Sequence, residues 1–206
     1  MVGDGVLSVQ FRLLGPVEVW IGGLSLNPGR PHQRAVLAAL LVDAGRVVPV
    51  DTLIDRVWGQ VAPEQVRTSL RAHLSRIRRL LEQAGQRGTP EGVLSYVSGG
   101  YVLRVDSDQI DLHVFRRLAC AAGQAGGTDS PVESLRVALA LWRGQPLAGI
   151  EGEWAGRMRE LWFRERVDAA VAWARAELAR ANPGPVLASL AELASEHRLV
   201  EPSPRC

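Results

Sequence analysis

The chain has 206 residues and a formal net charge of +2, and its 47% hydrophobic and 22% charged residues argue for a buried core and against intrinsic disorder. All 24 basic residues are arginine, which excludes a P-loop lysine, a kinase-type phosphate lysine and a Schiff-base lysine. The first 105 residues carry a net charge of +4 and the remainder −2, so we expect a polyanionic partner to meet the first half.

The two cysteines, Cys120 and Cys206, give little basis for a disulfide framework. No basic segment followed by an apolar run begins the chain, and no stretch reaches about 18 uninterrupted apolar residues. The sequence therefore predicts a cytoplasmic protein with no signal peptide and no membrane span.

Three short segments within residues 9–26 alternate between apolar and polar residues, and glycine-containing turns separate them. This pattern predicts an antiparallel meander of short strands. From Pro31 the apolar residues recur at helical spacing, which predicts one helix ending at Gly45 and a second from about Asp51 to Gly59.

A third predicted helix, over residues 64–85, is amphipathic. Its apolar residues recur every three or four positions and form a predicted buried stripe: Val66, Leu70, Leu74, Ile77 and Leu81. The opposite direction carries small, hydroxyl and basic side chains: Thr68, Ser69, Ala72, Ser75, Arg76 and Arg79. Arg67, Arg71 and Arg78 lie on the flank, and no acidic residue occurs between Gln65 and Leu81.

These residue types suit DNA binding. Arginine presents a planar fork that matches phosphate oxygens or the O6/N7 edge of guanine. Serine and threonine hydroxyls reach phosphates, and a small alanine can contact a thymine methyl group. His73 lies beside this face, where a phosphate contact is favoured over acid–base chemistry. The alternative is a solvated helix face, because arginine-rich surfaces are common where lysine is not used.

A β-hairpin is predicted next, with strands over residues 93–97 and 101–105 and a turn at Gly99-Gly100. Three helices, of which the third is basic, followed by a hairpin form a winged helix-turn-helix. In that fold the third helix enters the major groove and the tip of the hairpin meets the flanking backbone.

The sequence resembles the OmpR/PhoB-type winged helix in its element order, in VRTSLRAHLSRIRRLL at residues 66–81 and in YVSGGYVLRV at residues 96–105. It resembles the Streptomyces antibiotic regulatory protein (SARP) family more narrowly in LLGPVEVW at residues 13–20, RPHQRAVLAALL at 30–41 and DLHVFRRLACAA at 111–122. The resemblance covers about residues 7–200. It implies a winged helix followed by an all-helical bacterial transcriptional activation domain.

By this resemblance Ala72 and Arg76 face the bases. The positions on or beside the surface that faces the DNA backbone are Thr68, Ser69, His73, Ser75, Arg78 and Arg79, and we add Arg71 to the DNA-binding set. The OmpR-type wing often carries an arginine before its glycine turn, whereas this chain has Tyr96-Val97-Ser98. Ser98 or backbone N–H groups are therefore expected to serve there. No receiver-domain pattern is found, so control by phosphorelay is not expected.

Beyond Asp106 only helical patterns remain. Helices are predicted from Asp111, from Pro131 to Gly144 with Ser130 as N-cap, over residues 153–181, and over residues 184–197. Residues 111–144 form a pair about as long as one tetratricopeptide repeat (TPR). Four tryptophans here are favoured as core residues over a groove for a partner: Trp142, Trp154, Trp162 and Trp173.

The predicted fold class is α+β, a winged helix-turn-helix with an N-terminal β-meander followed by an all-α, TPR-like domain. The expected domains are residues 1–106 for DNA binding and residues 107–206 for activation. By the family resemblance, the second domain is a shortened or truncated one.

No catalytic motif, metal-ligand cluster or cofactor-binding motif is found, so an enzyme, a cofactor and a metal are not expected. The sequence predicts a sequence-specific transcriptional activator that binds double-stranded promoter DNA. By resemblance it binds tandem repeats as pairs of protomers, contacts RNA polymerase and controls a secondary-metabolite (antibiotic) gene cluster. The alternative is a helical-repeat scaffold that binds proteins, with the basic helix as ordinary surface.

Overall fold

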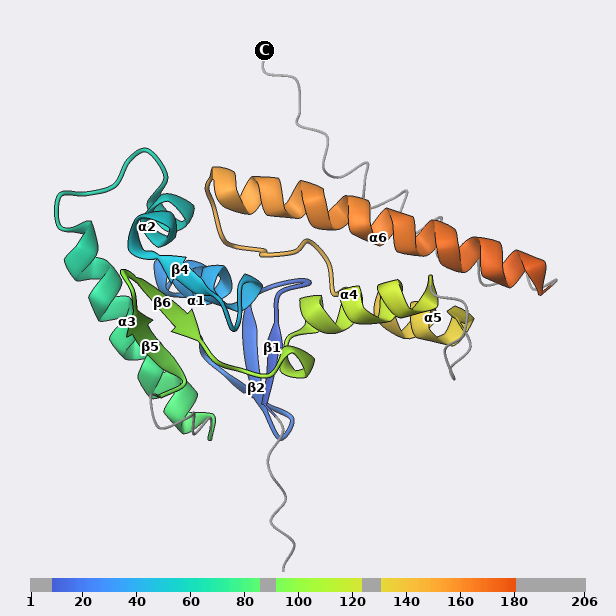
Figure 1. The fold of residues 1–206 in the computed structure, drawn as a ribbon, viewed down its shortest axis with the longest axis horizontal. Coiled ribbons are helices and arrows are strands. Elements are labelled where there is room, and N and C mark those ends of the chain that lie inside the picture. Colours follow the sequence, from blue (N-terminus) through green and yellow to red (C-terminus); the bar gives the residue numbers. More distant parts are fainter. Residues whose placement is uncertain (1–8, 86–91, 124–130, 181–206) are drawn as a thin grey trace, which may run out of the picture.

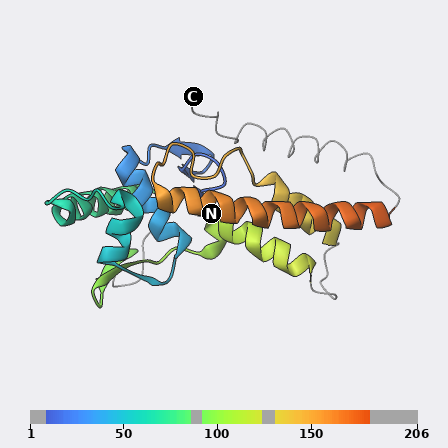
Figure 2. The same cartoon turned by 90° about the horizontal axis from the view of Figure 1, so that it is seen from above.

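The computed structural model describes residues 9–85, 92–123 and 131–180. These residues form a small sheet, three helices with a second small sheet, and then helices only. Two views at right angles place helix α3 (Val66–Gln83) and the C-terminal end of helix α6 (Glu153–Ala179) at opposite ends of the long axis (Figures 1 and 2). The basic helix and the far end of the helical half therefore face different surroundings.

The first sheet is the predicted meander, with strands β1 (Val9–Arg12), β2 (Glu18–Ile21) and β3 (Leu24–Leu26) in the order β1-β2-β3. Phe11 lies opposite Val19 in the antiparallel register, and both side chains are fully buried. Because side chains alternate across a strand, these residues attach one face of the sheet to the helices.

The winged helix follows. Helices α1 (Pro31–Val42) and α2 (Val50–Trp58) pack with α3 and with a second sheet of strands β4 (Val47–Pro49), β5 (Leu94–Val97) and β6 (Gly100–Leu103). The order in this sheet is β4-β6-β5, and β5 and β6 form the hairpin of the wing beside α3 (Figure 1). This confirms the predicted winged helix with an N-terminal meander.

Two details of the second sheet differ from the prediction. The hairpin turn is Ser98-Gly99, with φ of 48° and 82°, and Gly100 already belongs to β6. Gly100 is needed for a different reason, because a Cβ there would collide with the carbonyl oxygen of Val48 on β4. Strand β4 was not anticipated, since three residues are too few to show an alternating pattern.

The helical half contains α4 (Asp111–Ala122) after a short 3-10 turn (Ser107–Gln109), then α5 (Pro131–Ala140) and α6. Helices α4 and α5 pack side by side, and α5 also packs on α6 (Figure 2). Helix α5 ends before the predicted Gly144, because the chain turns back to the first sheet and the Arg143 N–H donates to the Leu14 carbonyl at 2.8 Å. The predicted Ser130 cap and the predicted helix over residues 184–197 lie outside the described residues.

The four tryptophans of the helical half belong to the core. Trp162 is fully buried, and none of the four is more than 8% exposed. The Trp142 ring meets Phe115 of α4 edge to face, with centroids 5.3 Å apart. These large apolar side chains join the three helices into one packed unit.

A buried carboxylate connects the helical half to the first sheet. Asp111 is 7% exposed and accepts hydrogen bonds from the backbone N–H groups of Leu13 (2.8 Å) and Leu14 (3.1 Å) and from Arg143 (2.9 Å). Burial raises the pKa of the Asp111 carboxyl, and these hydrogen bonds oppose the rise. The Leu147 N–H also donates to the Leu13 carbonyl, so the segment after β1 is held from two sides.

Candidate nucleic-acid interface

Helix α3 is amphipathic, as its sequence predicts. Leu70, Leu74, Ile77 and Leu81 are buried, and Leu80 joins them, whereas Val66 in the first turn is only half-buried. The outward face carries the exposed members of the predicted site: Thr68, Arg71, Ala72, Ser75, Arg76 and Arg79. Ser69, His73 and Arg78 are half-buried at its edges. Nine of the ten predicted residues therefore share one helix, and the tenth, Ser98, is exposed at the tip of the wing.

The arginines of α3 fall into two groups. Among the described residues, Arg71, Arg76 and Arg79 have neither an ion-pair partner nor a side-chain hydrogen bond. Arg67 at the start of the helix is ion-paired, with Nη2 donating to Asp51 Oδ1 at 2.6 Å. Arg78 points toward the wing. Within the described part of the chain, the unpaired group forms a positive surface along the outward face of the helix.

The wing is attached to α3 by Arg78. Its Nε donates to the carbonyl oxygen of Leu94 on β5 at 3.0 Å. A second arginine, Arg104, donates to the Ser95 hydroxyl within the hairpin. The tip itself has no charged side chain from Leu94 to Leu103, so Ser98 and its neighbours can offer only neutral groups.

His73 packs under the basic face in an aromatic cluster. Its ring lies 6.3 Å from the ring of His32 on α1 and 6.1 Å from that of Trp58 on α2, measured between centroids. Burial lowers the pKa of His73, and the nearby charges of Arg76 and His32 lower it further, so the imidazole is neutral near pH 7. No sequence pattern indicates that His32 and Trp58 belong to this cluster, because no spacing rule connects residues on three separate helices.

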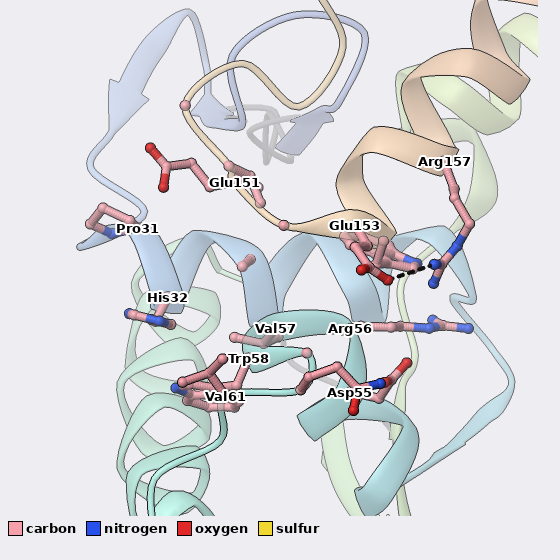
Figure 3. Close-up of a pocket in the computed structure, with 17 residues that line it drawn as sticks. Pro31, His32, Asp55, Arg56, Val57, Trp58, Val61, Glu151, Glu153 and Arg157 are labelled. Carbon is pink, nitrogen blue, oxygen red and sulfur yellow. Dashed lines mark hydrogen bonds and ion pairs between the residues drawn. The ribbon is translucent and has the colours of Figure 1, made fainter.

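A pocket of about 560 Å³ separates the winged helix from the beginning of α6. Figure 3 shows His32, Trp58 and Val61 on one side of it and Arg56, Glu153 and Arg157 on the other. Arg56 also donates to Asp43 at 2.6 Å and lies 5.7 Å from the ring centroid of Trp154. Side chains of both charge signs line the pocket. The contact of Arg56 with Trp154 beside it joins the winged helix to α6.

Over residues 9–85, 92–123 and 131–180, no three His, Cys, Asp or Glu side chains are grouped as a metal site would require. In the same residues, no helix has the length and apolarity that crossing a membrane demands.

Comparison with known families divides the chain at the same place as the change in fold. Residues 28–103 match the family described as "Transcriptional regulatory protein, C terminal", and residues 110–205 match "Bacterial transcriptional activator domain". A winged helix with a basic third helix, followed by a domain of this activator family, defines a class of bacterial transcriptional regulators.

Individual relatives belong to the same class. Regulatory protein AfsR of Streptomyces coelicolor is 39% identical over 156 residues, covering 74% of this chain and 15% of AfsR. Transcriptional regulator RedD of the same organism is 33% identical over 94% of this chain and 56% of RedD. The solved structure "Mycobacterium tuberculosis EmbR in complex with low affinity phosphopeptide" superposes with a TM-score of 0.81 at 33% identity, covering 93% of this chain and 51% of that one.

The chain belongs to the SARP family of transcriptional activators. It spans about half the length of EmbR and RedD and about a seventh of AfsR.

Proposed function

We propose that this chain is a sequence-specific transcriptional activator that binds double-stranded promoter DNA in the cytoplasm and is not an enzyme. The observation that carries the proposal is the group Arg71, Arg76 and Arg79, exposed on α3 without a partner among the described residues. Unpaired arginines on an acid-free helix face suit a polyanion, whereas a protein-binding scaffold would have no need to leave them uncompensated.

The proposed contacts follow the position of each side chain. Arg76, midway along the helix, and Ala72, one turn before it, meet base edges in the major groove. The residues proposed to meet the DNA backbone are Thr68, Ser69, Arg71, His73, Ser75, Arg78, Arg79 and, on the wing, Ser98. His73 acts there as a neutral ring, and Arg78 also positions the wing through its bond to Leu94.

The helical half is proposed to contact RNA polymerase while pairs of protomers occupy tandem promoter repeats. Two observations support this division of labour: the activator-domain match over residues 110–205 and the position of the C-terminal end of α6 at the opposite end of the long axis from α3 (Figure 1). The regulated genes are proposed to be a secondary-metabolite cluster, because the chain resembles the Streptomyces antibiotic regulatory proteins and its relatives AfsR and RedD are regulatory proteins from Streptomyces coelicolor. We propose domain limits of 1–106 and 107–206, joined through Asp111.

The test is a binding titration of the full chain at two salt concentrations, using a duplex that the chain selects from a random library and a duplex of random sequence. We expect preference for the selected duplex and a steep fall in affinity with salt, since phosphate contacts release counterions. In vitro transcription from a promoter containing the selected sequence then tests activation. Binding that is weak, insensitive to salt and without preference would favour the scaffold function.

A further inference from the structure

The wing carries one large side chain that the proposed function leaves unused. Tyr96 on β5 is 60% exposed, although the hairpin that contains it lies beside α3 (Figure 1). A single exposed aromatic residue needs no explanation by itself. Tyr96 differs from other exposed side chains because its ring packs on Tyr101 and its strand is hydrogen-bonded to α3.

The ring is fixed before any ligand arrives. Tyr96 lies directly opposite Tyr101 of β6 in the antiparallel register, and Tyr101 is only 8% exposed. The two rings meet near edge to face, with centroids 5.2 Å apart and planes at 67°, which is a favourable aromatic geometry. A ring held in this way loses little conformational entropy when it forms a new contact.

The strand is fixed relative to α3. The bond from Arg78 to the Leu94 carbonyl joins α3 to β5 two residues before Tyr96. Residues two apart on a strand point to the same side, so the side chains of Leu94 and Tyr96 form a row that leads from the core, where Leu94 is 4% exposed, to solvent. The tight turn at Ser98-Gly99 closes the hairpin just beyond.

We propose that Tyr96 is a second DNA contact of the wing beside Ser98, its phenolic O–H donating a hydrogen bond to a phosphate oxygen beside the groove that α3 occupies. This rests on the proposed function. Tyrosine hydroxyls are established donors to DNA phosphates. Because residues 94–103 carry no charge, a neutral donor is what the wing can offer, and the phenol reaches further than the hydroxyl of Ser98.

The experiment compares Tyr96→Phe, Tyr96→Ala and the wild-type full chain on the selected and the random duplex across a salt series. Tyr96→Phe keeps the ring on Tyr101 and removes only the hydroxyl. We expect binding to both duplexes to weaken by roughly tenfold to a hundredfold, the range for a hydrogen bond from a neutral donor to a charged acceptor, with an unchanged preference ratio. The salt slope should also be unchanged, because a neutral donor displaces no counterion. In a hydroxyl-radical footprint of Tyr96→Phe on the selected duplex, the DNA backbone should lose protection only beside the major-groove site.

Leu24→Ala is the matched control, since Leu24 is 74% exposed in the first sheet and should leave DNA binding unchanged. Unaltered binding by both Tyr96 variants, with wild-type preference intact, overturns the Tyr96 proposal alone. Weak binding by Tyr96→Ala with normal binding by Tyr96→Phe also overturns it, because the ring and not the hydroxyl would then matter. Normal binding with reduced transcription would assign Tyr96 to a protein contact instead. A wild-type chain without preference would overturn the proposed function itself.

Discussion

Helix α3 and the helical half use the same basic residue in different surroundings. In the described helical half, Arg116 on α4 is bidentate to Glu165 on α6 at 2.9 Å, Arg136 pairs with Glu133 within α5, and Arg143 pairs with buried Asp111. On the outward face of α3, Arg71, Arg76 and Arg79 have no such partner among the residues that the structure describes. In a chain without lysine, the number of arginines indicates little, and the position of the acids separates structural arginines from binding ones.

The difference has a cost for folding. Arg76 and Arg79 are three residues apart on α3, so their side chains are neighbours on the helix surface and their like charges repel each other. The buried leucine stripe of α3 offsets this, because each fully buried leucine contributes about 1.5–3 kcal/mol. Folding alone does not require the unpaired arginines, whereas phosphate groups would neutralise them.

Replacing Asp111 with alanine should have the largest effect on stability. The change leaves Arg143 without its carboxylate and the N–H groups of Leu13 and Leu14 without an acceptor, in a buried site. Breaking a buried pair in this way costs about 3–5 kcal/mol. Urea unfolding of the full chain measures it, and Glu133→Ala, which removes an exposed pair on α5, should leave the midpoint unchanged. Equal effects of the two changes would show that burial does not distinguish the pairs.

Arg76→Ala tests the binding side of the comparison. Loss of a base contact should cost about 1–3 kcal/mol on the selected duplex and relax specificity at one base step. Binding to random duplex should weaken less, so the preference ratio falls. The ratio is obtained from titrations of both duplexes at the same salt concentration.

The control for Arg76 is Arg136→Ala, which removes an arginine of equal charge that is paired with Glu133 on the helical half. It should bind both duplexes as the wild type does. If Arg76→Ala keeps the wild-type ratio, the face of α3 that reads bases has been assigned wrongly. If Arg136→Ala loses as much affinity as Arg76→Ala, net charge and not pairing controls binding.

Local periodicity explains how much of this site could be predicted. The spacing of Leu70, Leu74, Ile77 and Leu81 was enough to orient α3 and to place Arg76 outward. Nothing local could show that Arg78 bonds to Leu94, because the partner is a backbone carbonyl of a later strand. The pairing of Asp111 with Leu13 and Leu14, almost a hundred positions earlier, had no sequence signal either. Contacts between distant segments are made by the fold and not by a pattern.

Arg79→Ala and Arg67→Ala together sharpen the comparison within one helix. Arg79→Ala should weaken binding to the selected and random duplexes alike, because phosphate contacts carry no sequence information. Arg67 lies outside the proposed contacts, so Arg67→Ala should weaken binding to both duplexes only by lowering the positive charge of the helix. Arg79→Ala should lower the salt slope by about one. The reduction should be smaller for Arg67→Ala, since Asp51 already neutralises part of the Arg67 charge. Equal reductions would show that the Arg67–Asp51 pair opens on DNA.

The smallest expected effect is a pH dependence of the free energy of unfolding, which arises because the charge of Arg76 lies near His73. Burial and the charge of Arg76 hold the pKa of His73 below 6.5, its ordinary value. As the pH falls through 6.5, the unfolded chain therefore takes up a proton at this position before the folded chain does, and the free energy of unfolding decreases. His73→Gln should remove this part of the decrease, and Arg76→Ala should reduce it, because one source of the shift is lost. Urea unfolding at about pH 7.5 and about pH 5.5 measures the difference. A decrease that is the same in all three would mean that the unpaired charge of Arg76 is not felt at His73.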